Sequence, residues 1–223
     1  MSTFDKKRSE WDQQALSSAD LKKQVCRPTT EQAWQALLID IKSKLQISTK
    51  LNSILDVGCG NGLLLSKLAD DFDQLYGVDY ASSMVEQAKI LMPKQCFSVA
   101  EAAKLNFDDS SFDRVLSYSI FHYFPEQDYI IKAINEMIRV TKPGGIILIG
   151  DLLDKDFEQK IKGASDPLIE EKLPDIMRYS QWTFCDLAAV KLHFSHQVKH
   201  IEILNQPEHF QLSEYRKDLR ICL

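Results

Sequence analysis

The sequence predicts an α/β fold with a doubly wound, mostly parallel sheet of seven strands and an antiparallel last strand. From about residue 54 to residue 151, short apolar runs alternate with segments whose apolar residues recur at helical spacing. Such alternation is typical of a parallel sheet covered by helices on both faces. The last two strands are joined by a loop around Pro207 that is too short for a crossover helix, so we expect them to be antiparallel to each other.

The individual elements follow from apolar periodicity and from the residues that interrupt it. The segment between Leu152 and Tyr179 is polar, and Gly163, Pro167 and Pro174 should break it into short helices. Strands are predicted at residues 53–58, 75–79, 95–100, 112–119, 144–151, 197–205 and 215–223, and helices at about 9–25, 29–45, 63–70, 82–92, 125–140 and 182–194.

The composition narrows the class of protein. A chain of 223 residues with 44% hydrophobic and 26% charged residues fits one globular domain. Its net charge of −5 argues against broad binding to a phosphate backbone. The five cysteines are scattered and lack CxxC spacing, which predicts neither a zinc site nor a disulfide framework and fits a reducing cytoplasm. The N-terminus lacks the apolar core of a signal peptide, and no apolar run approaches the ~18 residues of a membrane span.

Three glycines stand directly behind the first predicted strand, in the stretch ILDVGCGNGLL at residues 54–64. A glycine cluster at a strand-to-helix corner lets a ligand approach the backbone closely. In doubly wound folds, such a corner followed by an acid at the end of the next strand holds an adenosine-bearing cofactor. Asp79 follows Gly62 by seventeen positions, a spacing that suits a carboxylate on ribose hydroxyls.

Two other interpretations of this corner remain. A dinucleotide fingerprint requires G-x-G-x-x-G, whereas Gly58, Gly60 and Gly62 give G-x-G-x-G with Leu63 at the third glycine position, which disfavours a nicotinamide cofactor. Alternatively, the glycines form only a tight turn and Asp79 is only an exposed strand end.

Between about Ile54 and Asp151 the chain resembles the class I S-adenosylmethionine-dependent methyltransferases. The first motif is LDVGCGNG, and GVDYASSMVEQAK, AEAAKLNFDDSSFD, SYSIFHYFPE and VTKPGGIILIGD follow in the order and spacing of that family. The resemblance implies a Rossmann-like methyltransferase fold and S-adenosyl-L-methionine as cofactor.

The resemblance also implies which residues hold the cofactor. The glycine loop lies under its methionine portion, Asp79 takes the ribose hydroxyls, and Tyr80 and Met84 flank the adenine, although the spacing of Met84 also suits plain core packing. Glu101 stands where many relatives have Asp for the adenine amino group, which is a departure from the family pattern. The expected cofactor-binding residues are Asp56, Gly58, Gly60, Gly62, Asp79, Tyr80, Met84, Glu101, Ala102 and Tyr118.

The acceptor should bind beyond the carboxyl ends of the strands, where open parallel sheets hold ligands. Aromatic and histidine side chains gather in the loops of that edge, although each could equally be structural. Of the five histidines, His122 and His209 fall there, and His122 is the preferred general base because it closely follows the fourth strand. The alternative is that its ring only shapes the pocket. The expected acceptor-binding residues are Trp11, His122, Tyr123, Tyr179, His209 and Phe210.

These inferences divide the single domain into a helical lid (residues 1–50), a cofactor-binding core (51–151), a substrate-side insertion (152–180) and a C-terminal helix with a strand pair (181–223). The predicted function is methyl transfer to an oxygen of a small metabolite or sugar-like acceptor, by in-line displacement driven by alignment. We expect a cytoplasmic protein with no metal, no nucleic-acid partner and no membrane contact, and the sequence leaves monomer and dimer open. The competing hypotheses are a non-catalytic cofactor-binding partner subunit and a nicotinamide-dependent oxidoreductase.

Overall fold

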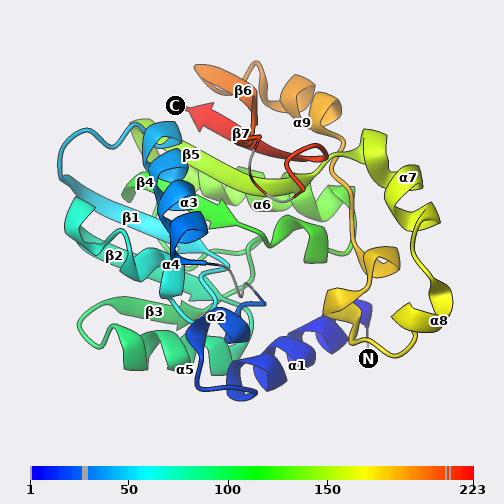
Figure 1. Ribbon diagram of the computed structural model, residues 1–223. Helices are drawn as coiled ribbons and strands as arrows, with labels where there is room; N and C mark the ends of the chain where they lie inside the picture. The colour runs from blue at the N-terminus through cyan, green and yellow to red at the C-terminus, as the bar shows by residue number, and fades with distance from the viewer. Residues whose placement is uncertain (1, 27–29, 209, 211) are drawn as a thin grey trace.

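The computed structural model describes residues 2–26, 30–208, 210 and 212–223, which form a seven-stranded sheet with helices on both faces (Figure 1). The strand order is β3-β2-β1-β4-β5-β7-β6, and β7 runs antiparallel to both of its neighbours while the other pairs are parallel. The predicted fold class is therefore confirmed. The strands are β1 (Leu51–Val57), β2 (Phe72–Asp79), β3 (Cys96–Val99), β4 (Phe112–Tyr118), β5 (Thr141–Leu153), β6 (His200–Asn205) and β7 (Arg216–Cys222).

One face of the sheet is covered by α3 (Glu31–Lys44), α4 (Leu63–Ser66) and α5 (Ser82–Leu91). Ile41 of α3 and Val85 of α5 are fully buried against this face. The predicted helix at 63–70 is shorter in the structure, because a 3-10 turn replaces its second half.

The opposite face is covered by α6 (Gln127–Val140) and α9 (Leu187–Phe194). Because side chains alternate along a strand, Ile54 of β1 packs in the first layer and Leu55 in the second. Both layers thus form continuous apolar cores on the two sides of the parallel strands. The residues of α6 that are buried at helical spacing are Ile130, Ala133, Ile134, Met137 and Val140.

The N-terminal segment contains two helices, α1 (Thr3–Leu16) and α2 (Leu21–Gln24), so the expectation of one helix from about Ser9 to Val25 is wrong. The reason is local capping. Ser2 and Asp5 form a reciprocal capping box that starts α1 earlier, and Asp20 caps the start of α2. Figure 1 shows α1 lying apart from the sheet, whereas α3 packs on it.

The segment after β5 carries short helices, as its glycine and prolines predict. Gly163 is the last residue of α7 (Glu158–Gly163), and Pro167 is the first of α8 (Pro167–Glu170). The 3-10 turns of the chain are η1 (Ala69–Asp71), η2 (Phe121–Tyr123), η3 (Lys155–Phe157), η4 (Asp175–Met177) and η5 (Tyr179–Gln181).

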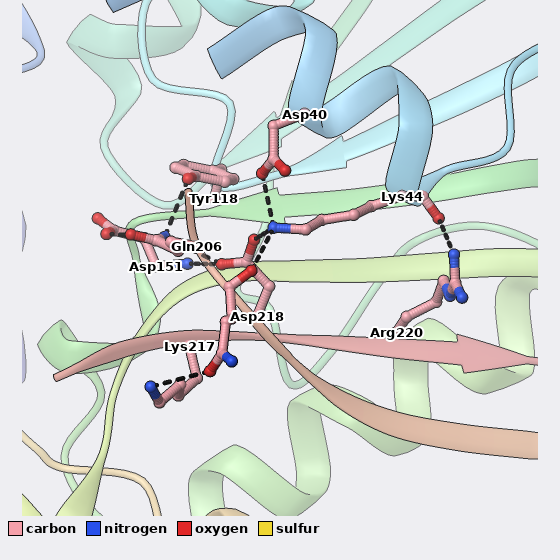
Figure 2. Close-up of polar contacts among 9 residues, drawn as sticks. Asp40, Lys44, Tyr118, Asp151, Gln206, Lys217, Asp218 and Arg220 are labelled. Atoms are coloured by element: carbon pink, nitrogen blue, oxygen red, sulfur yellow. Dashed lines mark hydrogen bonds and ion pairs between the residues drawn. The ribbon is translucent and has the colours of Figure 1, made fainter. Parts of the chain in front are cut away.

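A buried polar network connects α3 to β5 and β7 (Figure 2). Lys44 Nζ of α3 lies 2.7 Å from Asp218 Oδ2 of β7 and 2.6 Å from Asp40 Oδ2. Asp218 Oδ1 accepts hydrogen bonds from the backbone N–H of Asp151 at 2.9 Å and from Gln206 Nε2 at 3.0 Å. Burial raises the pKa of Asp218, and the Lys44 ammonium with these donors opposes the rise. The fully buried carboxylate therefore depends on its partners.

Replacing Lys44 by Met tests this dependence. The variant leaves Asp218 buried without its cation, so its free energy of unfolding in urea should fall by about 3–5 kcal/mol. The double variant Lys44→Met/Asp218→Asn should recover much of that loss. The matched control is Lys160→Met, because Lys160 pairs with Glu214 and both side chains are exposed, which limits its effect to about 1 kcal/mol. Equal losses for Lys44→Met and Lys160→Met would refute the stated role of the network.

Candidate functional site

A cavity of about 990 Å³ lies at the carboxyl edge of the parallel strands. Residues at the ends of β1, β2, β4 and β5 line it, including Asp56, Asp79, Tyr118 and Asp151. Phe4 and Trp11 of α1 line it as well. The cavity therefore occupies the place where open parallel sheets hold their ligands.

The glycine loop forms one wall of this cavity. Gly58, Gly60 and Gly62 have φ angles of +80°, +53° and +77°, a region that favours glycine. The backbone N–H groups of Gly58 and Cys59 donate to the Val78 carbonyl at 2.7 and 2.9 Å. A side chain at Gly58 would come within 2.5 Å of Ile120 Cδ1. The glycines thus serve a tight turn, and close approach of a ligand to this loop stays a prediction.

Two buried carboxylates stand at the ends of β1 and β2. Asp79 Oδ2 accepts from the N–H of Gly60 and Oδ1 from that of Ala81, both at 2.9 Å, so this side chain fixes the glycine loop. Burial raises the pKa of Asp79 to about 6, and these N–H groups oppose the rise. Burial and the charge of Asp79 together raise the pKa of Asp56 to about 8. Such desolvated carboxylates suit a ligand that brings positive charge or hydroxyl donors.

The two residues expected to flank the adenine both line the cavity, but Glu101, which was expected at the adenine amino group, does not. Tyr80, Met84 and Ala102 line the cavity, and the Tyr80 hydroxyl is buried without a hydrogen-bond partner among the described residues. Glu101 instead pairs with Arg8 of α1 at 2.7 Å. Gly62 does not line the cavity either. It is the N-cap residue of α4 and lies against Ala88 of α5.

Three of the expected acceptor residues, His122, Tyr123 and Tyr179, gather around the Trp182 ring. His122 is 2% exposed, and its ring centroid lies 4.1 Å from that of Tyr123 and 4.7 Å from that of Trp182. Tyr179 packs edge-on against Trp182 at 4.6 Å. The residues of this expectation that line the cavity are Trp11, His122, Tyr123, Tyr179 and Phe210. His209 lies outside the described residues.

Sequence reasoning missed several polar residues of this wall. Asp151 ends the predicted fifth strand, and that position was a usable signal. Ser119 and Asp151 both adopt positive φ angles, of 63° and 65°, and their side chains are hydrogen-bonded to each other. Positive φ at non-glycine residues often marks functional sites. Arg216 and Gln206 come from the end of the chain, and only folding brings them to this wall.

The chain matches proteins of one family. Residues 55–149 match the model of the methyltransferase domain. A sterol 4-C-methyltransferase of Caenorhabditis elegans is 33% identical over 143 residues, which cover 59% of this chain and 42% of the nematode protein. A probable tRNA methyltransferase 9B of Mus musculus is 34% identical over 110 residues, which cover 49% of this chain and 24% of the mouse protein. The chain therefore spans less than half the length of these curated relatives.

A solved structure shares the fold over almost the whole chain. The N-methyltransferase NodS of Bradyrhizobium japonicum, in complex with S-adenosylhomocysteine, has a TM-score of 0.66 at 14% identity, and 96% of each chain is covered. Residues 55–149 therefore match the methyltransferase domain family, and the described chain shares the fold of a solved methyltransferase. This match bears out the resemblance seen in the sequence and gives no support to the oxidoreductase hypothesis. Within the described residues, no helix combines the length and apolar character needed to cross a membrane.

The raised pKa values of Asp56 and Asp79 predict pH-dependent ligand binding. A ligand that needs either carboxylate charged must first remove its proton when the pH is below that pKa. Affinity for S-adenosylhomocysteine, measured by calorimetry, should therefore rise from pH 5 to about pH 8, by up to about tenfold per unit for each proton released. Binding at pH 6.5 should release protons, which titrations in buffers of different ionisation enthalpy detect.

The variants Asp56→Asn and Asp79→Asn separate the two contributions. Asp79→Asn should flatten the profile below pH 6.5, and Asp56→Asn should flatten it nearer pH 8, because each removes one titration. A wild-type affinity that stays constant from pH 5 to pH 8 would contradict the assignment of these carboxylates to the ligand site.

Proposed function

We propose that the protein transfers a methyl group from S-adenosylmethionine to an oxygen of a small metabolite or sugar-like acceptor. The carrying observation is that one cavity joins the glycine loop and its carboxylates to an aromatic wall. Its volume of about 990 Å³ falls within the roughly 300–1,000 Å³ of small-molecule sites. That space can hold both a cofactor and a small acceptor.

Contacts of α1 with both ends of the cavity support a small acceptor. On the acceptor side, Lys7 Nζ donates to the carbonyl of Gln181 at 2.7 Å, and Glu10 accepts from the N–H of Ile176 at 3.0 Å. On the cofactor side, Asp12 accepts from the N–H of Ser83 at 2.7 Å. The helix thus spans the site between its two halves. A lid of this kind excludes water from the reacting groups, and it favours acceptors that fit beneath it.

The residues present fit the proposed cofactor. Asp79 would take its ribose hydroxyls, Asp56 would face its positive charge, and the unpartnered Tyr80 hydroxyl would lie beside its adenine. When bound, S-adenosylmethionine supplies a methyl group on a sulfonium, which an acceptor oxygen can take by in-line displacement. The work left to the protein is to align the acceptor, exclude water and accept a proton.

His122 is the proposed acceptor of that proton. Its ring lines the cavity, and the carbonyl of His122 accepts from the N–H of Thr183 at 2.9 Å, which fixes the backbone. The ring centroids of Tyr123 and Trp182 lie 4.1 and 4.7 Å from that of His122, with both ring pairs tilted. This packing equally fits a ring that only shapes the pocket, so activity has to distinguish the two roles.

Tritium transfer from labelled S-adenosylmethionine into a cell extract tests the proposed function. The products are separated into small molecules, RNA and protein, and label is expected in the small-molecule fraction. Label confined to RNA would instead support an acceptor of the kind named for the mouse relative. Label in no fraction, despite tight binding of S-adenosylhomocysteine, would support the non-catalytic partner subunit.

The variant His122→Ala tests the proton-accepting role. Loss of a general base should lower turnover by ~10²–10⁴-fold while the affinity for S-adenosylhomocysteine is kept. Turnover is measured with the small-molecule fraction that accepts label, and His196→Ala, at an exposed histidine away from the cavity, serves as the control. Near-normal turnover with a raised KM for the acceptor would mean that His122 shapes the pocket only.

A further inference from the structure

Arg216 is a buried cation in the wall of the acceptor cavity. It is the first residue of β7, it lines the cavity, and it is 7% exposed. A buried guanidinium needs a compensating charge and hydrogen-bond acceptors for its donors. The acceptors that its N–H groups find, or lack, therefore indicate whether Arg216 only stabilises the fold or also binds a ligand.

The described chain satisfies only part of this guanidinium. Arg216 Nη1 lies 2.5 Å from Asp151 Oδ2, so the two side chains form a buried ion pair. The guanidinium carbon lies 5.8 Å from the centroid of the Trp182 ring. The Nε atom is buried and has no hydrogen-bond partner among the described residues. Tyr215 also shares a side-chain hydrogen bond with this guanidinium, so Nε is the donor that remains without an acceptor among the described residues.

Hydrogen bonds from other segments hold the Asp151 side chain that contacts Arg216. The Asp151 carboxylate accepts from Ser119 Oγ and, at 3.5 Å, from Gln206 Nε2. The Asp151 backbone N–H donates to Asp218, which the Lys44 ammonium compensates (Figure 2). Ser119 and Gln206 thus hold the carboxylate that orients Arg216, and Asp218 holds its backbone. Such support is typical of side chains held for binding.

A purely structural ion pair between β5 and β7 does not explain why Arg216 Nε has no acceptor among the described residues. Leaving a buried donor without an acceptor costs free energy, and a side chain that only stabilised the fold would gain by turning this donor to an oxygen. The donor instead belongs to a residue of the cavity wall, beside Trp182. Trp34 Nε1 is a second buried donor of the same wall without a partner among the described residues.

We propose that Arg216 anchors a carboxylate of the methyl acceptor, which is thus a small carboxylic acid whose apolar body packs on Trp182. This proposal rests on the proposed function and adds the chemical class of the acceptor. The side of a guanidinium that carries Nε matches a carboxylate with two parallel hydrogen bonds. Trp182 also contacts the His122 ring, so an acid anchored by Arg216 lies within the aromatic wall that contains the proposed base.

The test compares carboxylic acids with their own primary amides. Benzoate, phenylacetate and 3-phenylpropionate are each titrated into the protein saturated with S-adenosylhomocysteine, and so are the three amides. Because a hydrogen bond to a charged group is strong, at least one acid should bind about tenfold or more tighter than its amide. Equal affinity for acid and amide in all three pairs would overturn the proposal.

Two variants assign any preference to Arg216. Arg216→Lys keeps the charge and the contact with Asp151 but lacks the planar fork, so it should reduce the preference for the acid. Arg216→Met/Asp151→Asn removes both buried charges together, which avoids an uncompensated carboxylate, and should abolish the preference. A preference that survives in the double variant would overturn the proposal.

Binding of S-adenosylhomocysteine separates this proposal from the proposed function. The variants are compared at equal saturation with S-adenosylhomocysteine, and their melting temperatures confirm that they are folded. Tight binding of S-adenosylhomocysteine without any acid preference would refute the carboxylate anchor and leave the methyltransferase proposal intact. Absence of S-adenosylhomocysteine binding in the wild type would refute the proposed function itself.

Discussion

The ion pair between Lys44 and Asp218 is the interaction on which the acceptor side of the molecule depends. It places a fully buried carboxylate in β7, and that carboxylate binds the backbone of Asp151 and the side chain of Gln206. These contacts fix the end of β5 beside the antiparallel strand. A charge buried in this way is costly unless each partner is in place, so the same network that stabilises the edge also specifies its geometry.

The two halves of the cavity are built by different means. The cofactor half uses backbone conformation and carboxylates from consecutive strands, where Asp79 holds the Gly60 N–H. The acceptor half collects side chains from segments far apart in the chain, such as Trp11, His122 and Arg216. The glycine loop and its carboxylates can therefore recur in proteins that act on different acceptors. The wall that contains His122 and Arg216 can change through substitutions in separate segments.

The fold and the glycine wall of the cavity were predictable because their signals are local. Strand–helix alternation and the loop at Pro207 specify the sheet, and the glycine corner with Asp79 forms one continuous stretch of sequence. The polar acceptor wall was not predictable, because Arg216 and Gln206 reach Asp151 only through the position of β7 between β5 and β6. The start of α1 was misplaced because the capping box at Ser2 precedes any apolar periodicity.

The most direct test of the account is calorimetric titration of the protein with S-adenosylhomocysteine and, separately, with NAD. The glycine corner, the buried carboxylates and the family match predict binding of S-adenosylhomocysteine at one site per chain, with little or no heat from NAD. Binding of NAD in preference to S-adenosylhomocysteine, or no binding of S-adenosylhomocysteine at pH 7.5, would contradict the account.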